Sequence, residues 1–137
     1  ICMARCIRVK LGLNAKMQVN LEKEKIYEVI LNIFINAIRF SPPNTEIEIS
    51  SKITEDSYII SIEDQGIGLT EKEKSQIFKP FGKIERYGQG WELQVGGTGM
   101  GLYISKKIIN LHNGKIWVES KGRGKGSVFY FSLPIRE

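Results

Sequence analysis

The sequence contains only two cysteines and a single histidine, which limits the metal and redox chemistry open to it. Cys2 and Cys6 are separated by three residues, one more than in a CxxC redox pair, and no second pair follows to complete a zinc site. We therefore expect two reduced thiols. His112 is predicted to lie at a helix C-terminus, where an imidazolium is favourable, so we expect a structural role for it and not that of a phosphate acceptor.

Long hydrophobic runs and strongly one-sided charge are also missing. No apolar stretch approaches the ~18 residues of a bilayer-spanning helix, and the first residues lack the layout of a signal peptide. The formal net charge is +5, and only KGRGK at residues 121–125 is densely basic. Because it lies between two strand-like runs, we expect a solvated hairpin turn. These features predict a soluble, cytoplasmic domain that binds no nucleic acid, and they leave open whether a parent protein is membrane-anchored.

The length and composition are those of one domain covering residues 1–137. A chain of 137 residues with 42% hydrophobic residues can bury a single core without disulfides. The chain begins abruptly with Ile1 in a strand-like stretch. We therefore expect a piece of a longer protein.

The hydrophobic pattern alternates between the period of a strand and that of a helix. It predicts strands at residues 6–13, 45–53, 57–64, 115–120 and 127–134, and helices at residues 21–40, 70–78 and 98–112. Residues 82–97 have no sustained period and are expected to form a mobile lid. This order predicts an α+β fold: a two-layer α/β sandwich with a mixed, mostly antiparallel sheet and about three helices on one face.

The segment LNIFINAIRFSP, residues 31–42, places two amides on one helix face. Asn32 and Asn36 are four residues apart, and Arg39 lies one turn further on. An amide oxygen suits Mg²⁺, and a guanidinium suits phosphate. Alternatively, the amides cap nearby backbone groups and Arg39 is a surface charge.

Two glycine-rich motifs follow, EDQGIGL at residues 63–69 and GGTGMG at residues 96–101. In the first, Asp64 can accept a hydrogen bond from the exocyclic amine of adenine, while Gly66 and Gly68 let the backbone turn sharply and approach a flat ligand. A plain turn is the alternative. The second motif opens a helix, whose unpaired amides can bind phosphate. Neither a P-loop nor a dinucleotide fingerprint is present, so the motifs together predict an ATP site.

The segment FKPF lies between these motifs. Phe78 and Phe81 flank Lys79-Pro80 at the start of the expected lid. They are expected either to pin a hinge or to pack in the core, and the two interpretations are compatible.

In these four motifs the sequence resembles the catalytic and ATP-binding domain of sensor histidine kinases, in the wider family of gyrase, Hsp90 and the mismatch-repair ATPases. Residues 32–42 resemble the N box, 64–68 the G1 box, 78–81 the F box and 97–101 the G2 box. The resemblance covers nearly the whole chain and implies a Bergerat-type ATP-binding fold. Asn32 stands where the true ATPases of the family keep a glutamate base, which implies slow hydrolysis.

The resemblance also implies roles for single residues, with ATP and Mg²⁺ as cofactors. Asn36 would ligate Mg²⁺, Asn32 and Arg39 would act in catalysis, Phe40 would border adenine, and Asp64 would bind its amine. Lys83 stands in the lid, where the family more often has an arginine. The expected nucleotide-binding residues are Asn32, Asn36, Arg39, Phe40, Asp64, Gly66, Gly68, Lys83, Gly97, Thr98, Gly99, Met100, Gly101 and Leu102.

The function implied is that of a two-component sensor histidine kinase. The domain would donate the ATP γ-phosphoryl group to a histidine on a separate dimerisation domain, which would pass it to a response regulator. Nothing before Leu21 can form the helical hairpin that carries such a histidine, so the isolated domain, expected to be monomeric within a homodimeric parent, should bind ATP without autophosphorylating. The alternatives are an anti-sigma-factor-like serine kinase and a nucleotide-sensing module without transfer activity.

Overall fold

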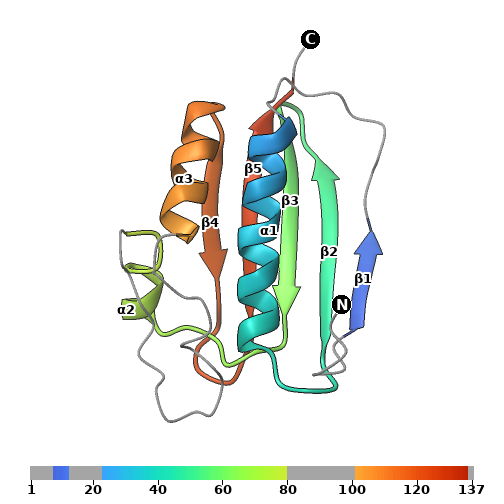
Figure 1. Cartoon of the computed structure of the whole chain (residues 1–137), viewed down its shortest axis with the longest axis vertical. Coiled ribbons are helices and arrows are strands. Elements are labelled where there is room, and N and C mark those ends of the chain that lie inside the picture. The colour runs from blue at the N-terminus through green and yellow to red at the C-terminus, as the bar shows by residue number, and fades with distance from the viewer. Residues whose placement is uncertain (1–7, 13–22, 80–100, 136–137) are drawn as a thin grey trace.

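The chain folds into one five-stranded sheet with helices packed on it (Figure 1). The structure is a computed structural model and describes residues 8–12, 23–79 and 101–135. The elements follow one another in the order β1 (Arg8–Gly12), α1 (Lys23–Phe40), β2 (Glu46–Ile53), β3 (Ser57–Asp64), α2 (Glu71–Lys74), α3 (Gly101–Leu111), β4 (Lys115–Glu119) and β5 (Ser127–Pro134).

The strands are arranged in the order β1-β2-β3-β5-β4. The pairs β2–β3, β3–β5 and β4–β5 are antiparallel, and β1 adds to the edge of β2 in parallel. The last strand of the chain therefore lies inside the sheet, between β3 and β4. Helices α1 and α3 lie side by side over the sheet, where α1 contacts β3 and α3 contacts β4 and β5 (Figure 1). This confirms the predicted α+β fold with a mixed, mostly antiparallel sheet.

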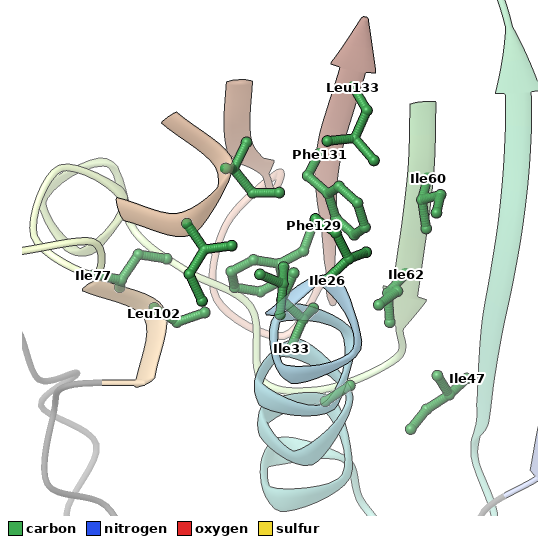
Figure 2. Packing of buried hydrophobic residues seen from close by; sticks show 14 of the residues in the cluster. Ile26, Ile33, Ile47, Ile60, Ile62, Ile77, Leu102, Phe129, Phe131 and Leu133 are labelled. Carbon is green, nitrogen blue, oxygen red and sulfur yellow. The ribbon is translucent and has the colours of Figure 1, made fainter. Parts of the chain in front are cut away.

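The core lies between the two helices and the sheet, where apolar side chains from both layers meet (Figure 2). On α1, Ile26, Val29, Ile33 and Ala37 recur at steps of three and four residues and are buried, as the helical period predicts. On β5, alternate residues point inward, as expected of a strand with one covered face. The sheet and α3 contribute Ile47, Ile60, Ile62, Phe129, Phe131, Leu133, Leu102, Ile108 and Ile109.

The end of α1 is set by a hydroxyl and two prolines. The Ser41 hydroxyl donates to the carbonyl of Ala37 at 2.6 Å, and the Ser41 amide donates to Ile38 at 3.3 Å. Pro42 and Pro43 follow and cannot continue the helix, because proline lacks an amide donor. The last turn, with Arg39 and Phe40, thereby ends beside the loop that follows β3, where the Phe40 carbonyl lies against Gly66.

The helix predicted for residues 70–78 is shorter than expected. Its capping box is confirmed: the Thr70 hydroxyl accepts from the Glu73 amide at 3.2 Å, and the Glu73 carboxylate accepts from the Thr70 amide at 3.0 Å. The helix nevertheless ends at Lys74. The Ser75 hydroxyl donates to the Lys72 carbonyl at 2.6 Å, and the Gln76 and Lys79 amides bond to carbonyls three residues back, so the chain continues in tight turns.

The remaining boundaries agree within a few residues where the structure describes them. Helix α3 ends at Leu111 and is closed by Asn113-Gly114 as expected: Asn113 has φ 62°, and the Gly114 amide donates to the Ile109 carbonyl at 2.9 Å. The His112 ring donates from Nδ1 to the Ile108 carbonyl at 2.8 Å, which fits the predicted structural role. The expected lid, residues 82–97, lies outside the described residues and stays a prediction.

Candidate functional site

Asp64 is a buried carboxylate at the end of β3, with 6% of its surface exposed. It lies opposite Ser127 of β5, and its Oδ1 accepts a hydrogen bond from the Gly66 amide at 2.8 Å. That bond orients the carboxylate at the point where the strand becomes a loop. A buried acceptor held in one orientation can distinguish a donor from an acceptor on a ligand.

The two glycines after Asp64 are required by contacts within the protein. A Cβ atom at Gly66 would collide with the Phe40 carbonyl at the end of α1. Gly68 has φ +74°, and a Cβ atom there would overlap the carbonyl of Gly122. The approach of a flat ligand to these glycines stays a prediction, and the structure adds that both lie close to other segments of the protein. Residues 65–70, which we call the nucleotide loop, are therefore packed tightly from both sides.

A small pocket brings together several of the residues predicted from the sequence. It encloses about 10 Å³, which is the space of about one water molecule. Of the predicted site residues it contains Asn36 and Phe40 from α1 together with Asp64 and Gly68. Its complete lining is Asn36, Phe40, Asp64, Gly68, Leu69, Ser127 and Phe129.

The two asparagines of α1 have different surroundings, although they share one side of the helix. The Asn32 side chain donates from Nδ2 to the Gly101 carbonyl and the Ser105 hydroxyl of α3, both at 3.2 Å. Asn36 lines the pocket and makes no side-chain hydrogen bond to another residue of the described part of the chain. Asn32 therefore joins the two helices, whereas Asn36 presents its amide to the pocket.

Arg39 lies in the last turn of α1 and is half-buried. Burial lowers the pKa of its guanidinium from the ordinary value, but an arginine so placed stays protonated at neutral pH. A cation at the C-terminal end of a helix is favoured by the helix dipole. Arg39 thus supplies a fixed positive charge one turn beyond Asn36.

Phe78 packs beneath the pocket and Phe81 lies outside the described residues. The ring of Phe78 meets the ring of Phe129 edge to face, with centroids 6.2 Å apart and planes at 78°. Phe129 also lines the pocket. The prediction that Phe78 packs in the core is confirmed, and this contact connects the start of the expected lid to the pocket wall.

The β4–β5 turn, residues 120–126, makes an extensive contact with the nucleotide loop that the sequence analysis missed. The hairpin itself is confirmed, but the turn is not merely solvated. The Gly124 amide donates to the Ile67 carbonyl at 2.7 Å, and the Gly126 amide donates to the Gly66 carbonyl at 3.1 Å. The sign available in the sequence was three alternate glycines, at 122, 124 and 126, and all three have positive φ in the structure.

The turn is also joined to the short helix α2. Arg123 forms a salt bridge with Glu73 at 3.0 Å, and Lys74 donates from Nζ to the Ser120 carbonyl at 3.2 Å. The first of these pairs is partly exposed and contributes little alone. Together with the backbone bonds, these contacts hold the nucleotide loop, α2 and the β4–β5 turn as one unit.

The predicted phosphate-binding segment is described only at its end. Gly101 begins α3, and Leu102 packs in the core with 9% of its surface exposed. The other predicted residues of this group, Lys83, Gly97, Thr98, Gly99 and Met100, lie outside the described residues. Within the described ranges, no helix is long and apolar enough to cross a membrane, and no group of three or more His, Cys, Asp or Glu side chains is placed to hold a metal ion.

Comparison with known proteins gives the same result from sequence and from structure. Residues 22–137 match the model of the histidine kinase-, DNA gyrase B- and HSP90-like ATPase family. The sensor histidine kinase WalK of Bacillus subtilis is 33% identical over 123 residues, 88% of this chain and 20% of WalK. The sensor protein KinB of Pseudomonas aeruginosa, named for alginate biosynthesis, is 34% identical over 133 residues, 96% of this chain and 21% of KinB.

Among solved structures, the catalytic domain of the histidine kinase ThkA superposes with a TM-score of 0.80 at 30% identity, covering 97% of this chain and 83% of that domain. The chain spans about a fifth of the length of the two curated relatives, but most of the ThkA domain. The chain therefore belongs to the histidine kinase-, DNA gyrase B- and HSP90-like ATPase family, within which it is similar to the catalytic domains of sensor histidine kinases.

Proposed function

We propose that this chain is the ATP-binding catalytic domain of a two-component sensor histidine kinase. It binds ATP with Mg²⁺ and donates the γ-phosphoryl group to a histidine on a separate dimerisation domain. The observation that carries the proposal is the buried Asp64 carboxylate, held in a pocket with Asn36, Phe40 and Gly68.

Adenine fits the hydrogen bonding of this pocket better than guanine does. The exocyclic amine of adenine is a donor, which an ionised carboxylate accepts. Guanine carries a carbonyl oxygen at the same position, which the carboxylate would repel. Phe40 lines the same pocket and supplies an apolar surface beside the base.

The Asn36 side chain suits Mg²⁺ bound together with a triphosphate. Mg²⁺ takes oxygen ligands and keeps several waters, and in nucleotide sites it uses one or two protein groups plus phosphate oxygens. The amide of Asn36 is such a group, and the described residues offer no carboxylate cage that would compete with it. When bound, Mg²⁺ neutralises charge on the phosphates and orients them.

Transfer in place of hydrolysis follows from the kind of side chain at position 32. Asn32 cannot accept a proton from water as a carboxylate would, and its NH₂ group is bound to α3. Arg39, Lys83 and residues 97–102 would contact the phosphates, as expected from the sequence. Positioning and charge neutralisation would then carry the phosphoryl transfer.

The partners are inferred from the related kinases. ThkA has been solved in complex with the response regulator protein TrrA; that kinase is 29% identical and this chain covers 36% of its length. We therefore expect a histidine-bearing dimerisation domain, a homodimeric parent and a response regulator as partners, with this domain in the cytoplasm, where ATP is supplied. The isolated domain should bind ATP as a monomer without phosphorylating itself.

Titration calorimetry with a nonhydrolysable ATP analogue tests the first part of the proposal. Saturable binding that requires Mg²⁺ and is absent with GTP is expected. Lack of binding, or equal binding of GTP, would contradict the adenine site.

Radiolabelled ATP and a dimerisation domain added in trans test the second part. Label on the dimerisation domain that is lost in acid is expected, because phosphohistidine hydrolyses in acid. Acid-stable label on a protein substrate would indicate a serine kinase, and ATP binding without transfer would indicate a nucleotide-sensing module.

A further inference from the structure

The hydroxyl of Ser120 uses its full hydrogen-bonding capacity on backbone groups of the chain. It accepts from the Leu69 amide at 3.0 Å and from the Gly122 amide at 3.2 Å, and it donates to the Gly126 carbonyl at 2.7 Å. A serine hydroxyl has one donor and two acceptor sites, so these three bonds occupy all of them. Ser120 follows directly after β4 and is therefore anchored to the sheet.

The bond to Leu69 connects this anchor to the nucleotide loop across a sequence separation of 51 residues. Leu69 has 2% of its surface exposed and lines the pocket beside Gly68. An amide at such a buried residue has little access to water, so it depends on the protein for its partner. Its partner is the Ser120 side chain and not a backbone carbonyl.

The other contacts between the turn and the nucleotide loop are different in kind. The Gly124 amide bonds the Ile67 carbonyl, and the Gly126 amide bonds the Gly66 carbonyl. These backbone bonds are available to any sequence that can adopt the turn. Within the described residues, the Ser120 hydroxyl is the side-chain group that joins the turn, through Gly126, to the pocket wall, through Leu69. It therefore helps to set the distance between them.

We propose that Ser120 is a positioning residue for the nucleotide site, which holds the Gly68-Leu69 wall of the pocket at the spacing that Asp64 needs to bind the base. The proposal rests on the function proposed above. Because Gly68 and Leu69 line the pocket that contains Asp64, which we assign to the base that both nucleotides share, loss of the hydroxyl should weaken ATP and ADP by the same factor. A variant of the phosphate-side Arg39 should instead weaken ATP more than ADP.

The experiment compares the wild-type chain with Ser120→Ala, Ser120→Thr and Ser61→Ala. Ser61 is a half-buried serine in the middle of β3 and serves as the matched control, because it lies away from the nucleotide loop. Affinities for a nonhydrolysable ATP analogue and for ADP are measured by calorimetry well below the melting temperature of each variant. Thermal melting is recorded in parallel.

We expect Ser120→Ala to bind both nucleotides about tenfold more weakly than the wild type, while Ser120→Thr, which keeps a hydroxyl, and Ser61→Ala stay within about twofold. A lower melting temperature with unchanged affinities would show a merely structural role and overturn the proposal. So would a loss confined to ATP. If Ser120→Ala does not fold, Ser120→Cys makes the same comparison, because a thiol is a weak donor and acceptor.

The proposed function and this inference fail in different ways. A wild-type chain that binds no adenine nucleotide would overturn both. A wild-type chain that binds ATP as expected, with a folded Ser120→Ala variant of equal affinity, would overturn only the role of Ser120.

Discussion

Replacing Asp64 by asparagine reverses one hydrogen-bonding group in the pocket while keeping its shape. The carboxylate is buried, and its Oδ1 accepts the Gly66 amide at 2.8 Å. The new amide oxygen can keep that bond, which leaves an NH₂ donor in place of the second carboxylate oxygen. Two donors, this NH₂ and the adenine amine, would then face each other.

The size of the effect follows from the lost bond. A hydrogen bond to a charged group contributes about 1.5–3 kcal/mol, and a tenfold change in affinity corresponds to about 1.4 kcal/mol. Binding of ATP should therefore weaken between about tenfold and a hundredfold. The contribution of the bond to the Gly66 amide to folding stability should survive the substitution, because the new amide oxygen still accepts it.

Calorimetry with ATP and inosine triphosphate measures both the loss and its cause. Inosine carries an oxygen where adenine carries the amine, so the wild-type carboxylate should disfavour it and the asparagine should not. Glu63→Gln is the matched control: it removes the same charge from the neighbouring residue, which is exposed and lies on the other face of the strand. We expect this control to bind ATP as the wild type does.

Two results would refute the reasoning on Asp64. One is ATP affinity within twofold of the wild type in a folded Asp64→Asn protein. The other is an equal loss for ATP and inosine triphosphate, which would mean that the substitution disturbs the pocket without changing its recognition of the base.

Two further comparisons separate residues that the sequence presents as alike. Asn32→Ala should lower the free energy of unfolding by about 1–3 kcal/mol in urea denaturation, because it removes the hydrogen bonds to α3. Asn36→Ala should change stability little and should remove the Mg²⁺ dependence of ATP binding in calorimetry. Equal destabilisation by the two substitutions would contradict this division. Gly68→Ala should prevent folding as judged by circular dichroism, because a positive φ is combined with overlap against the Gly122 carbonyl. Gly124 has φ +81° but open space around it, so Gly124→Ala should lower the free energy of unfolding by only about 1–2 kcal/mol. Similar stability of the two variants would rule out this explanation.

Much of the local structure could be predicted because the period of apolar residues is strong. The buried positions of α1 recur at three and four residues, and its C-terminal end was predicted correctly. The sequences of β3 and β5 have the period of a strand, and turn-forming residues flank each strand, so the boundaries of both strands were predicted correctly. The motifs singled out Asn36 and Asp64, and the resemblance to the kinase family added Phe40; the structure places all three in the lining of one pocket. These features depend on neighbours in the sequence.

The features that were missed depend on contacts between distant segments. Alternation predicts that residues 127–134 form a strand, but not that the strand pairs with β3 on one side and β4 on the other. Likewise, the hydrogen bonds of Asn32 to α3 could not be predicted, because its partners follow 69 and 73 residues later. The role of Ser120 required the nucleotide loop and the β4–β5 turn to be seen together.

The position of β5 inside the sheet has a consequence for synthesis on the ribosome. Until residues 127–134 emerge, β3 has an open edge, β4 has no partner, and Asp64 lacks the strand beside it. Pairings across such sequence distances form slowly, and an unpaired strand edge is prone to aggregation. ATP can stabilise only a chain that already has its binding site. The nucleotide can therefore protect the finished domain, while the nascent chain passes through its most vulnerable stage without that help.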